Sequence, residues 1–230
     1  MADIPFLNPS VLTQLDLPIP NRDSTPLLLE PLNLNREFIP SKDIQAYRHL
    51  YALDKLEGKF WQGYIKMPLF KLHVQVYQPD TEKIKGTVFL LHGYLEHSGI
   101  YQPIIRELLD QGFSVLTYDL PGHGLSNGNA ASIQNFDHYQ QVLHAVHQYV
   151  KNADQLPQPW LGIGQSTGGA IWMHHLLEYA QLRKNPIVER VLLLSPLVRP
   201  AKTSWWHNPV GLGIIRRIKR EVPRHFKRNN

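Results

Sequence analysis

Cysteine is absent from the 230-residue sequence, which excludes a disulfide framework and any cysteine-based metal site. Long hydrophobic runs are missing too, because stretches such as Val88–Leu91 and Val191–Leu194 are far too short to cross a bilayer. The first residues carry neither a basic start nor an apolar core segment, so we expect no secretory signal. By default we expect a cytoplasmic protein with no stable membrane insertion.

The residue spacings of common metal and nucleotide sites are also missing. Twelve histidines are present, but none of them forms an H-x-x-x-H or H-E-x-x-H pair. Gly162 and Gly164 match the first two glycines of a dinucleotide-binding motif, but Thr167 stands where the third glycine belongs. We therefore expect neither a metal ion nor another cofactor.

Positive charge is unevenly distributed along the chain, whose formal net charge is +5. Residues 216–228 contain seven basic side chains and one acid, and the rest of the chain has 17 basic against 18 acidic residues, a balance of −1. A nucleic-acid or membrane-surface role is one interpretation of such a cluster. We favour a solvated helix face, and we expect no nucleic-acid partner.

The composition that remains is that of an ordinary globular protein, with 43% hydrophobic and 19% charged residues. From residue 59 onward, segments of strand and helix character alternate, which is typical of a mostly parallel sheet flanked by helices. The expected strands span residues 59–67, 71–77, 86–92, 113–119, 160–164 and 188–195. The expected helices span residues 43–53, 100–111, 132–151 and 167–183.

These segments predict three regions. Residues 1–57 form an N-terminal arm with a short helix, and residues 58–200 form the α/β core. Residues 201–230 begin a further subregion that the sequence does not complete. Within the core, the first two strands are joined by a turn at Pro68 and favour an antiparallel hairpin.

The segment from Gly164 to Gly168 has the pattern G-x-S-x-G and lies between an expected buried strand and an expected helix. Such a strand–turn–helix holds the serine in a strained backbone conformation and exposes its hydroxyl at the edge of the sheet. The start of the following helix favours developing negative charge. The pattern therefore predicts Ser166 as a nucleophile.

The segment from His92 to Tyr101 follows the expected strand at residues 86–92. Acyl transfer needs two N–H groups that face the oxyanion of the tetrahedral intermediate, one after the nucleophile and one in the loop after the third strand. At these positions the sequence places the N–H groups of Thr167 and Tyr94, which we predict as the oxyanion hole.

The segment from Asp119 to Gly128 is rich in glycine and favours a tight turn near the floor of the site. Asp119 and His123 are tempting candidates for a catalytic acid and base. We interpret both as side chains that brace the loop, because they lie on the wrong loop for the order of a catalytic triad.

Together these three segments resemble the α/β-hydrolase superfamily, and within it the monoglyceride lipase and lysophospholipase group, also described as serine aminopeptidase-like. The resemblance covers about residues 58–200 and implies hydrolysis of a small-molecule acyl ester or lipid through an acyl-enzyme on Ser166. It also implies that residues 201–230 are the start of a cap. It rests on His92, Gly93, Glu96, His97, Ser98 and Tyr101, on Asp119, Gly122, His123, Gly124, Ser126 and Gly128, and on Gly164, Ser166, Gly168 and Gly169.

The chain departs from this group in the acid and the base of the triad. No aspartate follows Ser166, and the downstream histidines at positions 174, 175, 207 and 225 do not end a strand. In a comparable triad, loss of the histidine costs about a million-fold in kcat. We therefore identify no triad acid or base, and we expect the chain to be close to inactive and to be a C-terminally truncated hydrolase that lacks the last two strands.

Without those strands, the segment at 188–195 becomes a hydrophobic edge through which the chain could self-associate. Two alternatives remain open. One is a non-catalytic scaffold that binds a lipid or a protein partner, and the other is complementation by a separate polypeptide.

Overall fold

The computed structural model describes residues 30–197. The helices that it describes are α2 (Lys42–Leu50), α3 (Gln102–Asp110), α4 (Asp137–Ala153) and α5 (Thr167–Gln181), with short 3-10 helices at Leu53–Lys55 and Ser98–Tyr101. The strands are β1 (Lys59–Lys66), β2 (Lys71–Gln78), β3 (Thr87–Leu91), β4 (Ser114–Tyr118), β5 (Trp160–Gln165) and β6 (Arg190–Leu194).

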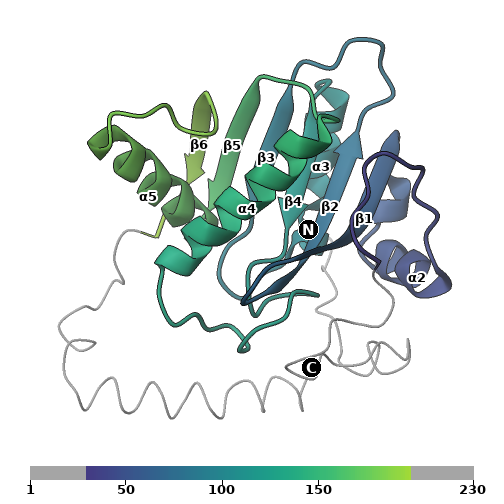
Figure 1. Ribbon diagram of the computed structural model, residues 1–230. Coiled ribbons are helices and arrows are strands. Elements are labelled where there is room, and N and C mark those ends of the chain that lie inside the picture. The colour runs from purple at the N-terminus through teal and green to yellow at the C-terminus, as the bar shows by residue number, and fades with distance from the viewer. Residues whose placement is uncertain (1–29, 198–230) are drawn as a thin grey trace. The chain divides into compact units, whose positions relative to one another are not determined.

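The strands form one sheet in the order β1-β2-β4-β3-β5-β6. The pairs β1–β2 and β2–β4 are antiparallel, whereas β4–β3, β3–β5 and β5–β6 are parallel. The expected hairpin and the mostly parallel sheet flanked by helices are therefore confirmed. Figure 1 shows α4 and α5 in front of this sheet and α3 behind it.

Alternate residues of the central strands build a hydrophobic cluster on each face of the sheet, because successive side chains of a strand point in opposite directions. Phe89 and Leu116 pack on the face covered by α4, together with Val142 and Val146 of that helix. Leu90 and Val115 pack on the opposite face with Ile105 of α3. Both faces of β3 and β4 are covered, and all ten of their residues are buried.

The ends of two helices show how local chemistry sets the boundaries. Gly112 has a φ of +83°, and its N–H donates to the Leu109 carbonyl at 2.8 Å while the next N–H reaches Leu108 at 2.9 Å. These two bonds end α3 at the glycine, as its sequence predicts. The expected start of α4 at residue 132 is wrong: the helix begins at Asp137, whose N–H donates to the Asn135 side chain at 3.0 Å. Such side-chain bonds compete with helix formation.

The segment before the first strand is not merely a surface arm. Leu32 and Leu34 are buried, and Pro31 forms a parallel bridge with Tyr64 of β1. The predicted cap region at 201–230 lies outside the described residues. Across residues 30–197, none of the helices is long and apolar enough to cross a membrane.

Candidate active site

Ser166 lies between the last residue of β5 and the first residue of α5, in a backbone conformation that is unusual for a residue with a side chain. Its φ is 49° and its ψ is −107°. Its N–H donates to the Leu194 carbonyl at 2.9 Å, and its carbonyl accepts from Leu197 and Ala170, both at 2.9 Å. The surrounding chain therefore uses both backbone groups of Ser166 to hold a strained turn.

The turn is possible only because glycines stand two positions before and two positions after Ser166. A Cβ atom at Gly168 would lie 2.3 Å from the Leu91 carbonyl oxygen, and one at Gly164 would lie 2.4 Å from the Gly168 carbonyl. Side chains at these two positions would drive β3, β5 and α5 apart. The spacing of glycine around Ser166 thus follows from close backbone contact.

The loop after β3 forms a tight turn with Tyr94 and Leu95 at its apex. The Glu96 N–H donates to the Gly93 carbonyl at 3.4 Å, and Leu95 has a φ of +63°. Tyr94 is 40% exposed and Leu95 69% exposed. The Tyr94 hydroxyl donates to the Ala131 carbonyl at 2.9 Å, which connects the apex to the loop after β4.

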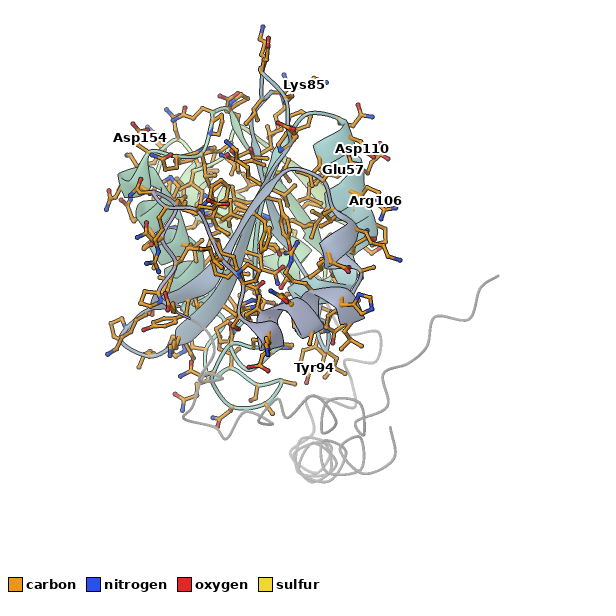
Figure 2. All side chains as sticks on the ribbon, turned by 90° about the vertical axis from the view of Figure 1, so that its right-hand side faces the viewer. Glu57, Lys85, Tyr94, Arg106, Asp110 and Asp154 are labelled. Atoms are coloured by element: carbon orange, nitrogen blue, oxygen red, sulfur yellow. The ribbon has the colours of Figure 1, made fainter. Side chains whose placement is uncertain are left out.

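The three residues predicted for acyl transfer lie at the same edge of the sheet. Strands β3 and β5 are parallel neighbours with Leu91 paired to Gly164, so Tyr94 and Ser166 each follow the carboxyl end of their strand. The Gly168 N–H donates to the His92 carbonyl at 3.1 Å and joins the two segments. In Figure 2, Tyr94 and Lys85, the residue two positions before β3, lie at opposite ends of the described part of the chain.

Thr167 is the first residue of α5 and is buried. The first N–H groups of a helix have no acceptor within the helix, and they carry its partial positive charge. The structure thus places the Thr167 N–H at the start of α5, directly after Ser166, and its role in an oxyanion hole stays a prediction.

His92 is buried and neutral. Its Nδ1 donates to the Gly93 carbonyl at 2.7 Å, and its Nε2 accepts the Leu120 N–H at 2.8 Å. Burial lowers the pKa of His92 to about 4. Because both ring nitrogens are already in use, His92 fastens the loop after β3 to the loop after β4.

Asp119 braces this arrangement, as the sequence predicts. Its fully buried carboxylate accepts the Ser98 N–H at 2.8 Å, the Ser98 hydroxyl at 2.6 Å, the Leu125 N–H at 2.8 Å and the His73 Nδ1 at 2.8 Å. Burial by itself would raise the pKa of Asp119, but His73 and the hydrogen bonds outweigh it and hold that pKa below its usual range. Both oxygens are occupied by these structural bonds.

His123 also has the predicted bracing role, since its Nδ1 donates to the Pro121 carbonyl at 2.9 Å. Sequence reasoning missed His73, which is fully buried and hydrogen-bonds Asp119 from β2, 46 positions earlier in the chain. A single histidine in an apolar strand gives no local signal of such a partner.

The two histidines of α5 differ in burial, because His175 is buried and the His174 side chain is 38% exposed. His175 is buried, accepts the Ile187 N–H at 3.2 Å and packs on Tyr179. His174 lies 3.9 Å from Asp137. Among residues 30–197, no histidine or carboxylate hydrogen-bonds the Ser166 hydroxyl, and the other two downstream histidines, at 207 and 225, lie outside the described residues.

Known proteins resemble the chain at both the sequence and the fold level. Human monoglyceride lipase is 35% identical over 96 residues, which are 41% of this chain and 31% of that enzyme. The monoacylglycerol lipase of Mycolicibacterium smegmatis is 31% identical over 96 residues, which are 42% of this chain and 34% of that enzyme. The chain thus spans about a third of the length of these relatives.

Among solved structures, the carboxylesterase CesB of Bacillus subtilis superposes with a TM-score of 0.51 at 21% identity, covering 66% of this chain and 48% of that one. This likeness concerns the fold. The model of the family described as serine aminopeptidase, S33, matches residues 82–226, which include both the loop after β3 and the turn at Ser166. The chain therefore belongs to the family described as serine aminopeptidase, S33, and part of it is similar to monoglyceride lipases.

Proposed function

We propose that Ser166 is the nucleophile of carboxylic-ester hydrolysis on a monoacylglycerol or lysophospholipid-like substrate. The observation that carries this proposal is the strained conformation of Ser166 at a strand–helix turn crowded by glycines. Strain of this kind is commonly retained where it serves function. The named lipid-ester activities of the relatives support the substrate class.

In the proposed reaction, the Ser166 oxygen attacks the ester carbonyl carbon, and the N–H groups of Tyr94 and Thr167 bind the oxyanion that forms. Each such donor is worth about 3–4 kcal/mol in comparable sites. The bond between the carbonyl carbon and the ester oxygen then breaks, and the alcohol leaves with the proton that the Ser166 hydroxyl has given up. Water hydrolyses the acyl-enzyme to the carboxylic acid and the free serine. Residues 30–197 supply this nucleophile half, and the proposal assigns no acid or base within them.

The test is turnover of short p-nitrophenyl esters together with labelling of Ser166 by a fluorophosphonate. We expect negligible turnover and slow labelling that Ser166→Ala abolishes. Turnover close to that of an intact esterase, also abolished by Ser166→Ala, would mean that a base is present which the proposal does not include. Labelling that persists in Ser166→Ala would refute the nucleophile.

A second candidate is a non-catalytic scaffold that binds a lipid or a protein partner. The occupied hydrogen bonds of His92 and Asp119 favour it, because these groups are structural. We also propose that the edge strand β6 allows self-association. Sedimentation at several protein concentrations measures the oligomeric state and tests both proposals. A monomer that also unfolds cooperatively supports the scaffold. Dimers that form as the protein concentration rises support association through β6.

A further inference from the structure

Glu96 and Tyr101 form a hydrogen-bonded cluster with the backbone at Gly93. One oxygen of Glu96, Oε2, accepts the Gly93 N–H at 2.8 Å and the Tyr101 hydroxyl at 2.5 Å. The Tyr101 hydroxyl oxygen also lies 3.2 Å from the Gly93 nitrogen and 3.2 Å from Oε1 of Gln165. The cluster therefore connects the loop after β3 with the end of β5.

The two ends of this cluster are the immediate neighbours of the proposed catalytic groups. Gly93 precedes Tyr94, whose N–H is one proposed oxyanion donor, and Gln165 precedes Ser166. Because Glu96 occupies the Gly93 N–H, that N–H is committed to the loop. The donor that the proposed function assigns to this loop is the Tyr94 N–H, one position further along the chain.

The space around Gly93 is filled by the same side chains. A Cβ atom there would lie 2.1 Å from the Gln165 Oε1 and 2.7 Å from the Glu96 Oε2. The loop therefore lies so close to the turn at Ser166 that the Glu96 carboxylate, the Gln165 amide and the Gly93 backbone leave one another no room to move. A displacement of the loop would break several of these contacts together.

The apex of the loop does not hold its own shape. Leu95 has a φ of +63°, in the left-handed region, and its side chain is 69% exposed. A left-handed conformation is costly for leucine and persists only where the surroundings impose it. Two hydrogen bonds between Glu96 and Gly93 close this turn. The Glu96 carboxylate accepts the Gly93 N–H, and the Glu96 N–H donates to the Gly93 carbonyl.

We propose that Glu96 is a positioning residue, which acts with Tyr101 to hold the Tyr94 N–H opposite Ser166. The inference rests on the proposed function of Ser166 and goes beyond it by assigning roles to the Glu96 and Tyr101 side chains. Burial and then the hydrogen bond to Glu96 raise the pKa of Tyr101, so that its hydroxyl stays a donor. Charge-assisted hydrogen bonds of this type are about twice as strong as neutral ones.

The experiment measures how a long-chain alkyl fluorophosphonate reacts with Ser166 at alkaline pH. The serine oxygen bonds to phosphorus, the P–F bond breaks, fluoride leaves, and hydroxide takes the serine proton. Mass spectrometry of the intact chain yields the affinity for the probe and the maximal rate of labelling. The 31P NMR shift of the adduct, compared with that of the unfolded adduct, reports whether the phosphonyl oxygen has its hydrogen bonds.

We expect Glu96→Ala to lower the maximal labelling rate about 10- to 100-fold, because misplacement of an oxyanion donor by about 1 Å has an effect of this size. The affinity for the probe should not change, and the 31P shift should move part of the way toward that of the unfolded adduct, because the Thr167 N–H stays in place. Glu96→Gln, which keeps an acceptor oxygen, should recover part of both. The matched control is Glu107→Gln on the exposed side of α3, which should label as the wild type does.

A folded Glu96→Ala protein with the wild-type rate and the wild-type 31P shift would overturn the proposal. If Glu96→Ala does not fold, Tyr101→Phe takes its place, because it removes only the hydroxyl. A wild-type labelling rate and a wild-type 31P shift in Tyr101→Phe would then overturn the proposal. If the wild-type chain labels no faster than Ser166→Ala, the proposed function itself fails. That outcome differs from one in which Ser166 labels and Glu96 makes no difference.

Discussion

Strands β3 and β6 are parallel neighbours of the same strand, β5, and both are five residues long, but they differ sharply in burial. Every residue of β3 is buried, whereas none of β6 is, and Leu192 in its centre is 54% exposed. Figure 1 shows β3 inside the sheet and β6 at its end. Both sequences are mainly apolar, so burial here depends on neighbouring elements and not on composition.

The same contrast extends to the two sides of Ser166. On the side of β3, the loop after that strand is held by side chains of Gln75 in β2, of Asp119 directly after β4, and of Gln165 in β5. On the side of β6, the described chain offers backbone bonds from Leu194 and Leu197, and Pro196 packs against Gly169. Tyr94, one of the two proposed oxyanion donors, thus lies on the side with dense side-chain support.

The largest expected effect is at Asp119, which supports the β3 side. Asp119→Asn should lower the free energy of unfolding by about 3–5 kcal/mol, because the amide removes a buried charge from its partners and places a donor against other donors. Urea unfolding measures this difference. Asp110→Asn on the exposed surface of α3 is the matched control and should stay within about 0.5 kcal/mol. A loss below that limit for Asp119→Asn would show that the loop does not depend on its carboxylate.

A matched pair of leucines tests the comparison of strands directly. Leu90→Ala in β3 should cost about 2–5 kcal/mol, because the side chain is fully buried. Leu192→Ala in β6 should cost less than about 0.5 kcal/mol. Urea unfolding at low protein concentration measures both. An equal cost at the two positions would mean that β6 is covered in solution, and a cost that grows with protein concentration would point to self-association at this edge.

The alternation of apolar segments and turns was enough to predict each strand to within a few residues. Strands β3 and β4 are short buried runs, and β5 alternates between buried and half-buried residues. The serine at the strand–helix turn followed from Gly164 and Gly168. These features are local, so a short window of sequence contains their cause.

What the sequence could not predict depends on distant partners. The bond between Asp119 and His73 joins residues 46 positions apart, and the contact of Tyr101 with Gln165 joins residues 64 positions apart. Glu96 was noticed only as part of a family pattern, with no role. The start of α4 at Asp137, five residues later than predicted, also depends on one side-chain hydrogen bond. The Asn135 side chain accepts the Asp137 N–H, and this bond competes with the helix that the apolar spacing predicts.

The pH dependence of stability should come from both sides of Ser166. Burial lowers the pKa of His92 and of His175 to about 4. In the unfolded chain these histidines bind protons below about pH 6.5, so the unfolded state gains protons first and stability falls from about pH 6.5 to about pH 4. Each histidine can contribute up to about 3 kcal/mol to this fall.

Urea unfolding between about pH 7 and pH 4 measures the free energy of unfolding at each pH. The quantity to compare among variants is the slope of this free energy against pH, and not its absolute value. His92→Gln and His175→Gln should each flatten the slope by a similar amount. If only His92→Gln flattens it, the side of β6 does not hold its histidine neutral.

The smallest expected effect concerns backbone strain on the two sides of the site. Ser166 has φ 49° and ψ −107°, and Ser195 after β6 has φ 45°. A strained residue costs about 1–3 kcal/mol, and glycine relieves that cost but loses about 0.5–1 kcal/mol of chain entropy. Ser166→Gly should therefore be more stable than Ser166→Ala by about 1 kcal/mol, whereas the two variants at Ser195 should be nearly equal. Thermal unfolding of the four variants measures this. If the stability difference between the Gly and Ala variants is the same at both positions, the turn at Ser166 stores no more strain than an ordinary left-handed residue. The conformation of Ser166 would then no longer support the proposed function.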